Sequence, residues 1–342
     1  MKKVSPDEIL SFAGQVIDVR SESEYAISHI PGAKSIPVLN DFSRKEVGTV
    51  YRQHGREAAI ARGLELTSPV LADIYRRFAQ FDGPLMLYCA RGGMRSHSIG
   101  HVLSGFGRDI TLIDGGYKAY RELVLNQTPE LIREKSFIVL QGNTGVAKTA
   151  ILNVLAERGF GVLDLEDLAK HSGSVFGHLT FPENQPSQKQ FENDLHQELR
   201  RLPKLVLCES ESRQIGRLYL PKELMAAMDS GRHILLETSL DARVQTIMAM
   251  YAGSLSQQKP RLIDALNQLR RRLSNATTDE LIQRIEQNDL EPVIRYLMEA
   301  YYDPLYRRSV RREDYDYILE LTFQSREEAI EIISNTIKEY IY

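Results

Sequence analysis

The sequence predicts an α/β protein of two units, each built on a parallel β-sheet, with a helical region completing the second. Three observations support this class. Short apolar runs alternate with helix-like stretches through the first ~130 residues, the same alternation restarts near residue 137, and helical periodicity dominates from Asp241 onward. We therefore place the first unit at residues 1–130 and the second at residues 137–342.

In the first unit, buried strands are predicted where apolar residues run together and turn residues follow. These runs are Val16–Val19, Leu85–Tyr88 and Ile110–Ile113. The polar segment Asn126–Ser136 contains a proline, and we predict that it is the linker between the two units.

The second unit begins with a further strand, Phe137–Leu140, followed by a glycine-containing loop and a helix from Lys148 to Arg158 that ends at Gly159. Later strands are predicted at Val162–Leu165, Leu205–Cys208 and His233–Glu237. Beyond them, apolar residues recur at helical spacing on one face: Leu262, Ile263, Leu266, Leu269 and Leu273.

Composition narrows the class of protein. An apolar content of 42% with 26% charged residues is typical of a globular chain. No run of about 18 apolar residues is present and the N-terminus lacks a signal-peptide core, so we expect a cytoplasmic protein without membrane contact. Two distant cysteines, Cys89 and Cys208, exclude a disulfide scaffold and a Cys-x2-Cys zinc site, and we predict no resident metal. The net charge of −3 leaves nucleic-acid binding open.

A cysteine lies on a glycine-rich loop between a predicted strand and a helix-like stretch, in the run Tyr88-Cys89-Ala90-Arg91-Gly92-Gly93-Met94-Arg95-Ser96. Backbone N–H groups and a helix N-terminus at such a place stabilise a thiolate. Arg91 and Arg95 add positive charge and can clamp an oxyanion. We therefore predict a catalytic group of Cys89, Arg91 and Arg95. The alternative is an inert buried cysteine, which the crowding of glycines and arginines disfavours.

A phosphate-binding loop is predicted at Gln141–Thr149, because Gly142-x4-Ala147-Lys148-Thr149 approximates the Gly-x4-Gly-Lys-Thr pattern between a strand and a helix. Gly142, Gly145, Lys148 and Thr149 are the expected phosphate ligands. Ala147 stands where the pattern has glycine, so phosphate binding is better supported than nucleotide hydrolysis. The alternative is a turn that merely starts a helix.

Carboxylates that follow an apolar strand, Glu209 and Glu211, are candidates to hold a Mg²⁺ ion beside this loop. Glu237 on the next predicted strand is a competing candidate for the same role. The alternative for each of these acids is a solvated position at the end of a strand, without a role in binding.

The first unit resembles the rhodanese family. Val16–Arg20, Glu24-Tyr25, His29–Ala33 and Asp114–Tyr117 carry the likeness together with the Cys89 loop. Ser28 departs from the usual glycine before the histidine. Cys89 and Arg95 are separated by five residues, one more than in typical sulfurtransferase loops, as in the Cys-x5-Arg cradle of related phosphatases. The resemblance therefore implies a substrate bulkier than a bare sulfur, such as one carrying a phosphoryl group.

Nearly the whole chain is similar to the bacterial tRNA 2-selenouridine synthases, with one departure at Ser172, where that family's arginine is expected. The motifs that carry the similarity are Lys45–Gln53, Gly55, Ala58–Ile60, Ser174–Gly177, Pro186–Lys189, Glu211–Arg213 and Tyr301–Tyr306.

This resemblance implies conversion of a wobble 2-thiouridine in tRNA to 2-selenouridine through an S-geranylated intermediate. Geranyl diphosphate and selenophosphate would be the substrates, with no tightly bound cofactor and Mg²⁺ considered only as a companion of the diphosphate. We infer that the Gly142–Thr149 loop would hold the diphosphate and that Cys89 would carry selenium as a selenylsulfide.

The tRNA is expected on positively charged surface, where phosphate contacts supply affinity. The densest basic runs contain Arg270, Arg271 and Arg272, and Arg307, Arg308, Arg311 and Arg312. The alternative is a solvated helix face whose charges are balanced by nearby acids such as Glu313 and Asp314.

The sequence is also compatible with two other functions. A Cys-x5-Arg phosphatase would use Cys89 as nucleophile and Arg95 to hold the transition state, with Asp114 as a weak candidate for the general acid. A non-catalytic binding module would combine the phosphate loop with an inert rhodanese-like unit, which the presence of Cys89 disfavours.

Overall fold

The computed structural model describes residues 1–172, 181, 184–251, 255–309 and 315–341, and the chain divides into two compact units. The first unit comprises Met1–Thr128 and Pro186–Gln197, and the second comprises Pro129–Gln185 and Glu198–Tyr342. Two helices, α5 (Gly116–Arg133) and α8 (Gln188–Arg201), are each divided between the units. The sequence did not predict that residues 186–197 pack with the first unit.

The first unit contains a five-stranded parallel sheet in the order β1-β5-β4-β2-β3, so β4 is its central strand. The predicted strands correspond to β2, β4 and β5, and these predictions are confirmed. The strands are β1 (Lys2–Val4), β2 (Gln15–Asp18), β3 (Lys34–Ser35), β4 (Leu85–Tyr88) and β5 (Ile110–Ile113).

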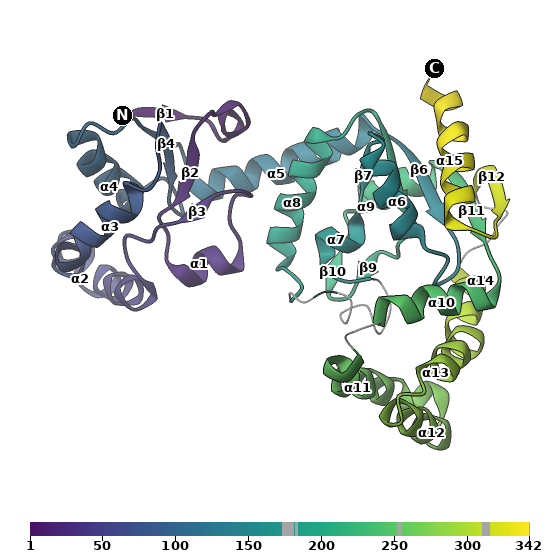
Figure 1. The fold of residues 1–342 in the computed structure, drawn as a ribbon. Helices are drawn as coiled ribbons and strands as arrows, with labels where there is room; N and C mark the ends of the chain where they lie inside the picture. The colour runs from purple at the N-terminus through teal and green to yellow at the C-terminus, as the bar shows by residue number, and fades with distance from the viewer. Residues whose placement is uncertain (173–180, 182–183, 252–254, 310–314, 342) are drawn as a thin grey trace. The chain divides into compact units, whose positions relative to one another are not determined.

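Helices cover this sheet on both faces (Figure 1). Along β4, Leu85 and Leu87 pack into one apolar cluster while Met86 and Tyr88 pack into another, because successive side chains of a strand point to opposite faces. The helical elements are η1 (Pro6–Ser11), α1 (Glu22–Ile27), α2 (Asp41–Thr67), η2 (Ser68–Val70), α3 (Leu71–Phe78), α4 (Met94–Gly105) and α5.

The two units divide between Thr128 and Pro129, within the predicted linker Asn126–Ser136. The expectation that this segment is an irregular linker is wrong, because α5 continues through it to Arg133 with Pro129 inside the helix. Buried residues recur along α5 every three or four positions: Tyr117, Tyr120, Val124, Thr128 and Ile132. This stripe gives the helix continuous packing, which outweighs the backbone hydrogen bond that the proline removes.

The second unit contains a five-stranded parallel sheet in the order β12-β11-β6-β8-β7, with β6 at its centre. The predicted strands are confirmed, although β7 is shorter than expected because α7 begins at Leu165. The edge strand β12 lies in the region predicted to be helical. The strands are β6 (Ser136–Gln141), β7 (Val162–Leu163), β8 (Leu205–Glu209), β11 (Arg232–Glu237) and β12 (Asp316–Thr322), with a separate antiparallel pair, β9 (Gln214–Ile215) and β10 (Leu218–Tyr219).

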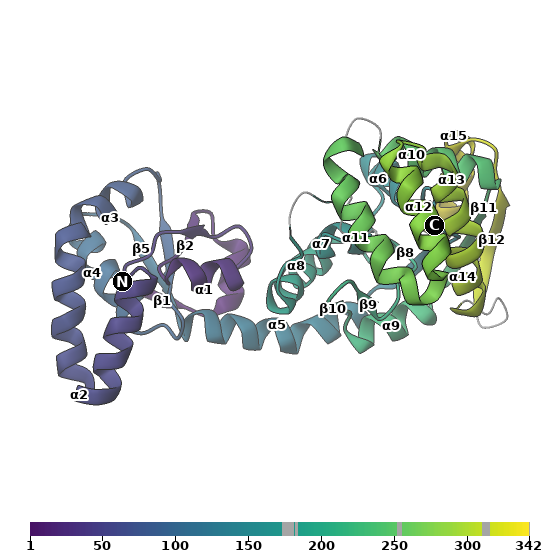
Figure 2. The same cartoon turned by 90° about the horizontal axis from the view of Figure 1, so that it is seen from below.

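The described residues of the second unit include two apolar cores. One packs α6 and α15 against the sheet, and the other holds the helical part together, with Leu262, Leu266 and Leu269 buried on the predicted face. Figure 2 shows α11, α12 and α13 gathered together in this part. The helices are α6 (Lys148–Glu157), α7 (Leu165–Ala169), α8, α9 (Lys222–Asp229), α10 (Leu240–Tyr251), α11 (Leu255–Leu273), α12 (Asn275–Glu286), α13 (Leu290–Leu297), the π-helix η4 (Met298–Tyr302), α14 (Asp303–Ser309) and α15 (Arg326–Ile341).

Candidate active sites

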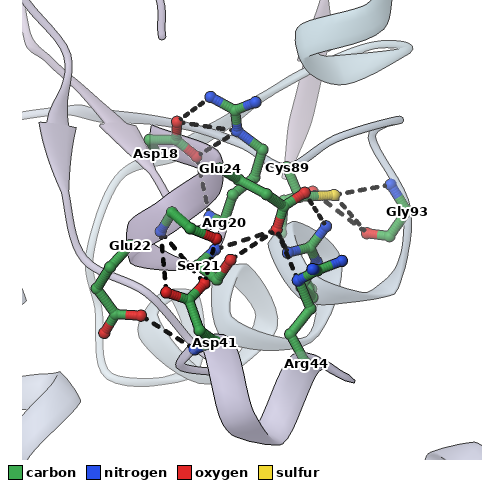
Figure 3. A network of polar contacts seen from close by, with 12 residues as sticks. Asp18, Arg20, Ser21, Glu22, Glu24, Asp41, Arg44, Cys89 and Gly93 are labelled. Carbon is green, nitrogen blue, oxygen red and sulfur yellow. Dashed lines mark hydrogen bonds and ion pairs between the residues drawn. The ribbon is translucent and has the colours of Figure 1, made fainter. Parts of the chain in front are cut away.

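Cys89 lies directly after the central strand β4, at the start of the loop that leads into α4. Its thiol is buried and accepts hydrogen bonds from the Gly93 amide at 3.1 Å (Figure 3) and from the Ser96 hydroxyl at 3.3 Å. The protonated thiol donates to the Gly93 carbonyl at 3.7 Å. Donors aimed at sulfur stabilise its anionic form. The loop therefore holds a sulfur atom in surroundings suited to a nucleophile.

Two backbone amides of α5 hold this loop in place by donating to its carbonyl groups. The Tyr117 amide donates to the Cys89 carbonyl at 2.9 Å, and the Lys118 amide donates to the Ala90 carbonyl at 3.0 Å. Gly116 has a φ of 59°, and a Cβ there would lie 2.2 Å from the Cys89 oxygen. The Asp114–Tyr117 motif thus holds the backbone of the cysteine loop in position. Glycine is needed there because a Cβ would prevent the two backbones from approaching so closely.

The two predicted arginines of this loop differ in their surroundings. Arg95 forms an ion pair with Glu24 at 2.6 Å, and Arg44 of α2 lies 3.7 Å from the same carboxylate. Burial opposes ionisation of Glu24, but the hydrogen bond and charge of Arg95 lower its pKa below the ordinary value. Arg91 is exposed. The guanidinium of Arg95 is therefore engaged by an acid of its own unit, whereas that of Arg91 faces solvent.

In the second unit the phosphate loop follows the central strand β6 and leads into α6, as the sequence predicts. Gly142 and Gly145 have φ values of 152° and 84°, and Ala147 is in the left-handed region with a φ of 67°. The Lys148 ammonium donates to the Gly142 carbonyl at 2.9 Å, across the loop. The amides at the start of α6 and this lysine together form an anion-binding arrangement.

Two carboxyl groups, those of Glu166 and Glu211, lie beside the loop. The Thr149 hydroxyl donates to Glu166 at 3.0 Å, and Glu166 and Glu211 share a hydrogen bond. Burial and the charge of Glu166 raise the pKa of Glu211 to about 8. Burial likewise raises the pKa of Glu166. These acids lie close enough that a proton or a cation must relieve their repulsion.

Glu209, which the sequence could not separate from Glu211, has a different position. One of its carboxylate oxygens accepts the amides of Leu165 and Glu166 at 3.0 and 3.1 Å, at the start of α7. Burial and the neighbouring acids raise its pKa well above the ordinary value. Of the two predicted acids, Glu211 lines the cavity at the phosphate loop and Glu209 does not.

A cavity of about 540 Å³ joins the phosphate loop to the helical part of the second unit. One end is polar and includes Lys148, Thr149, Glu166 and Glu211. The remaining wall is largely apolar and comes from α10 to α14: Ile247, Leu262, Ile285, Leu290, Val293, Ile294, Leu297, Met298, Tyr301, Tyr302, Leu305 and Tyr306. Such a cavity fits a ligand with an anionic head and an apolar body.

A buried ion pair connects the helical wall with the loop. Arg243 and Asp303 form two hydrogen bonds of 2.8 Å, and Arg243 also donates to the Thr144 carbonyl at 3.3 Å. A Cβ on Gly145 would lie 2.8 Å from the Arg243 carbonyl, so the loop packs closely here. Arg243 is not among the residues predicted from the sequence, and only the place of Asp303 within the Tyr301–Tyr306 motif could have drawn attention to the pair.

The predicted tRNA-binding arginines are spread over two elements. At the end of α11, Arg270 pairs with Asp279 at 2.7 Å, Arg271 is exposed, and Arg272 donates to the Tyr301 hydroxyl at 2.7 Å. Arg307 and Arg308 belong to α14, and Arg311 and Arg312 lie outside the described residues. Arg272 thus contacts a residue of the cavity wall, which the sequence did not indicate.

Two models of known protein families match the chain, one in its N-terminal part and one in the remainder. A rhodanese-like domain model matches residues 7–123, and a model described as the tRNA 2-selenouridine synthase AAA domain matches residues 135–339. The fold and sites therefore define a rhodanese-like domain joined to a P-loop-like domain.

Relatives named tRNA 2-selenouridine synthase match most of the chain. The protein of Bdellovibrio bacteriovorus is 31% identical and covers 91% of this chain and 94% of its own length. That of Alcanivorax borkumensis is 33% identical, with coverages of 85% and 88%. A solved N-terminal domain of a Clostridium difficile 630 protein, whose name includes ATP/GTP binding, is 41% identical over 36% of this chain and 97% of its own, with a TM-score of 0.33.

The chain belongs to the tRNA 2-selenouridine synthase family, and it is accordingly a tRNA-modifying transferase with tRNA as its substrate. Among the residues that the structure describes, no helix combines the length and apolar character needed to cross a membrane.

Proposed function

We propose that this enzyme converts a wobble 2-thiouridine of tRNA to 2-selenouridine in two steps, using geranyl diphosphate and then selenophosphate. The observation that carries the proposal is the cavity of about 540 Å³ with the phosphate loop at one end and an apolar wall along the rest. A nucleotide would place a polar base and ribose against this wall, whereas an isoprenyl chain is apolar throughout. The shape and chemistry therefore favour a prenyl diphosphate.

In the first step the 2-thio sulfur attacks C1 of geranyl diphosphate. An S–C bond forms, the C–O bond to the diphosphate breaks, and diphosphate leaves with the electron pair. Lys148 and the amides at the start of α6 stabilise the charge that develops on the leaving oxygens. The apolar wall holds the geranyl chain and keeps water away from the allylic carbon.

Mg²⁺ fits the polar end of the same cavity. The donors there are oxygens, from the hydroxyl of Thr149 and the carboxyls of Glu166 and Glu211, and Mg²⁺ takes oxygen ligands. A cation would also relieve the charge that burial makes unfavourable on these acids. When bound, Mg²⁺ supplies positive charge to the diphosphate, and these three residues would hold it.

In the second step Cys89 acts on selenophosphate. Its thiolate attacks phosphorus, an S–P bond forms, the P–Se bond breaks, and selenide leaves. The selenide attacks C2 of the S-geranylated uridine, where a C–Se bond forms and geranyl thiolate departs. Water then cleaves the S–P bond, which releases phosphate and restores Cys89. The selenylsulfide considered from the sequence would need a two-electron oxidant, whereas attack on phosphorus needs none.

The cysteine loop supports this route because its five intervening residues leave room for a phosphoryl group. The exposed Arg91 is the arginine we assign to the phosphoryl oxygens, since Arg95 is engaged by Glu24. We expect the reaction in the cytoplasm, where tRNA is modified.

One assay tests the proposal. The enzyme is incubated with a tRNA carrying wobble 2-thiouridine, with geranyl diphosphate and with selenophosphate, and the nucleosides are analysed by mass spectrometry over time. S-geranyl-2-thiouridine should rise first and 2-selenouridine should follow. Formation of neither nucleoside, together with release of phosphate from simple phosphate esters, would instead favour the Cys-x5-Arg phosphatase. Absence of every reaction would favour a binding module.

A further inference from the structure

Helix α2 is a hairpin of two antiparallel arms. Its backbone leaves helical geometry at Gly55, where φ is 80° and ψ is −170°. Across this turn Arg62 forms an ion pair with Glu46 at 2.6 Å. A Cβ on Gly63 would lie 4.0 Å from Val47. Figure 2 shows the two arms side by side. The segment contains the motif Lys45–Gln53, to which the two proposed reactions give no role.

The first arm and the turn expose large apolar side chains. Phe42 is 72% exposed and Tyr51 is 58% exposed. Each exposed ring presents a flat apolar face to solvent, on which a base can stack. Tyr51 follows Phe42 by nine positions, so at 3.6 residues per turn the two rings lie on opposite sides of the arm and flank the face that Lys45 and Arg52 share.

The same arm carries an excess of positive charge. Between residues 41 and 56 there are four basic and two acidic side chains, in a chain whose net charge is −3. Glu46 is paired with Arg62, and Asp41 accepts hydrogen bonds from Ser23. Within the part of the chain that the structure describes, the exposed Lys45, Arg52 and Arg56 form no ion pair. Uncompensated cations beside aromatic rings match single-stranded nucleic acid, which offers phosphates and bases together.

This surface begins at the cysteine loop. Glu24 contacts both Arg95, which follows the loop, and Arg44, which lies in the first turn of α2 (Figure 3). From Arg44 to Arg52 the arm rises about 12 Å at 1.5 Å per residue. A strand lying along it would thus lead toward Cys89.

We propose that the first arm of α2 and the turn after it bind the anticodon loop of the substrate tRNA, with Lys45, Arg52 and Arg56 on phosphates and with Phe42 and Tyr51 stacked on bases. Unstacked bases of RNA loops are recognised by aromatic side chains in this way. The inference rests on tRNA being the substrate of the proposed reactions, and it adds a binding surface on the rhodanese-like unit to the arginines predicted from the sequence.

The first experiment removes the positive charges, in the full-length Lys45→Gln/Arg52→Gln/Arg56→Gln variant. The probe is a synthetic anticodon stem-loop with wobble 2-thiouridine, and its Kd is measured by fluorescence anisotropy at several salt concentrations. Loss of three contacts to single-stranded phosphates should reduce the log–log salt slope by about 2. A control variant with equal charge change elsewhere on the same unit, Lys2→Gln/Lys3→Gln/Arg76→Gln, should keep the wild-type slope. Equal slopes in all three proteins would overturn the proposal.

A second experiment uses Phe42→Ala and Tyr51→Ala. Both side chains are exposed, so their loss leaves the core unchanged, and circular dichroism checks the fold of each variant. Each should weaken binding about 5- to 100-fold, because stacking on a base contributes about 1–3 kcal/mol. The salt slope should stay unchanged, since no charge is removed. An unchanged Kd in both variants would show that the rings do not stack on bases, and the proposal would fail.

These measurements use neither geranyl diphosphate nor selenophosphate. A result in favour of the α2 surface therefore stands even if the enzyme uses another alkyl donor. Conversely, formation of 2-selenouridine with wild-type binding in all variants would sustain the proposed reactions and remove only this surface.

Discussion

The cysteine loop at residues 89–93 and the phosphate loop at residues 142–147 hold equivalent places in two separate sheets. Each follows the central strand and leads into the N-terminus of a helix. They differ in what closes them. The backbone of Gly116 approaches the Cys89 carbonyl directly, whereas the phosphate loop meets Arg243 and Met298 of the helical part.

The charges at the two loops also differ. At the cysteine loop an acid, Glu24, engages a nearby arginine. At the phosphate loop two acids with raised pKa values, Glu166 and Glu211, surround a single lysine. The two loops have the same strand–loop–helix arrangement, so their different chemistry comes from the elements that surround them. A loop enclosed by backbone suits a small reagent, and a loop opening onto an apolar wall suits an amphiphilic one.

The largest expected effect separates the two loops by reaction. Cys89→Ala should abolish formation of 2-selenouridine while S-geranylated tRNA accumulates, because the proposed alkylation uses the cavity of the second unit and no group of the cysteine loop. Nucleoside mass spectrometry after incubation with both substrates measures this. Cys208→Ala is the matched control, since it removes the other thiol of the chain and should leave both products. Undiminished 2-selenouridine in Cys89→Ala would refute the assignment.

The second effect tests the wall of the phosphate site. Asp303→Asn leaves the Arg243 guanidinium buried without its negative partner. We expect the free energy of unfolding to fall by about 3–5 kcal/mol, as for other broken buried pairs. Denaturant titration followed by circular dichroism gives the value.

Glu331→Gln provides the comparison for this second effect. It removes a surface ion pair with Arg158 whose side chains are 39% and 62% exposed, and it should lower the free energy of unfolding far less than Asp303→Asn does, because solvent screens an exposed pair. A loss of similar size in both variants would mean that the Arg243–Asp303 pair contributes no more than a surface contact.

Much of this arrangement was predictable from the sequence. Leu85–Tyr88 and Ile110–Ile113 match β4 and β5 because a strand covered on both faces is apolar throughout and its ends are marked by turn residues. The start of α6 at Lys148 was also predictable, since the phosphate-loop pattern fixes where the helix begins.

The remainder depended on tertiary contacts. Pro129 indicated a linker, but packing along α5 decided otherwise. Glu209 and Glu211 were equivalent in the sequence, yet β8 ends at Glu209, so the alternation of a strand no longer determines where Glu211 points. The apolar wall assembles residues from five helices and a π-helix, and no local pattern specifies which of them face a common cavity.

A third effect concerns the lysine of the phosphate site. Lys148→Ala removes the ammonium that lies beside the loop, and hydrogen bonds to charged groups contribute about 1.5–3 kcal/mol. The KM for geranyl diphosphate should therefore rise about 10- to 100-fold, measured from initial rates of S-geranylation. Exposed Lys222→Ala, on α9 of the same unit, is the control and should leave KM unchanged. Normal alkylation by Lys148→Ala, together with loss of ATP binding, would assign the loop to a different ligand.

The smallest effect tests the one loop residue that departs from the phosphate-loop pattern. Ala147 has a φ of 67°, and the left-handed conformation costs a residue with a Cβ roughly 1–2 kcal/mol. Glycine avoids that cost but loses about 0.5–1 kcal/mol more backbone entropy on folding. Ala147→Gly should therefore raise the free energy of unfolding by about 0.5–1 kcal/mol, which denaturant titration can resolve. The same substitution at Ala150, inside the right-handed helix α6, should lower it by about 1 kcal/mol. Changes of the same sign at both positions would show that the backbone of Ala147 is not strained, and the departure from glycine would then have no energetic consequence.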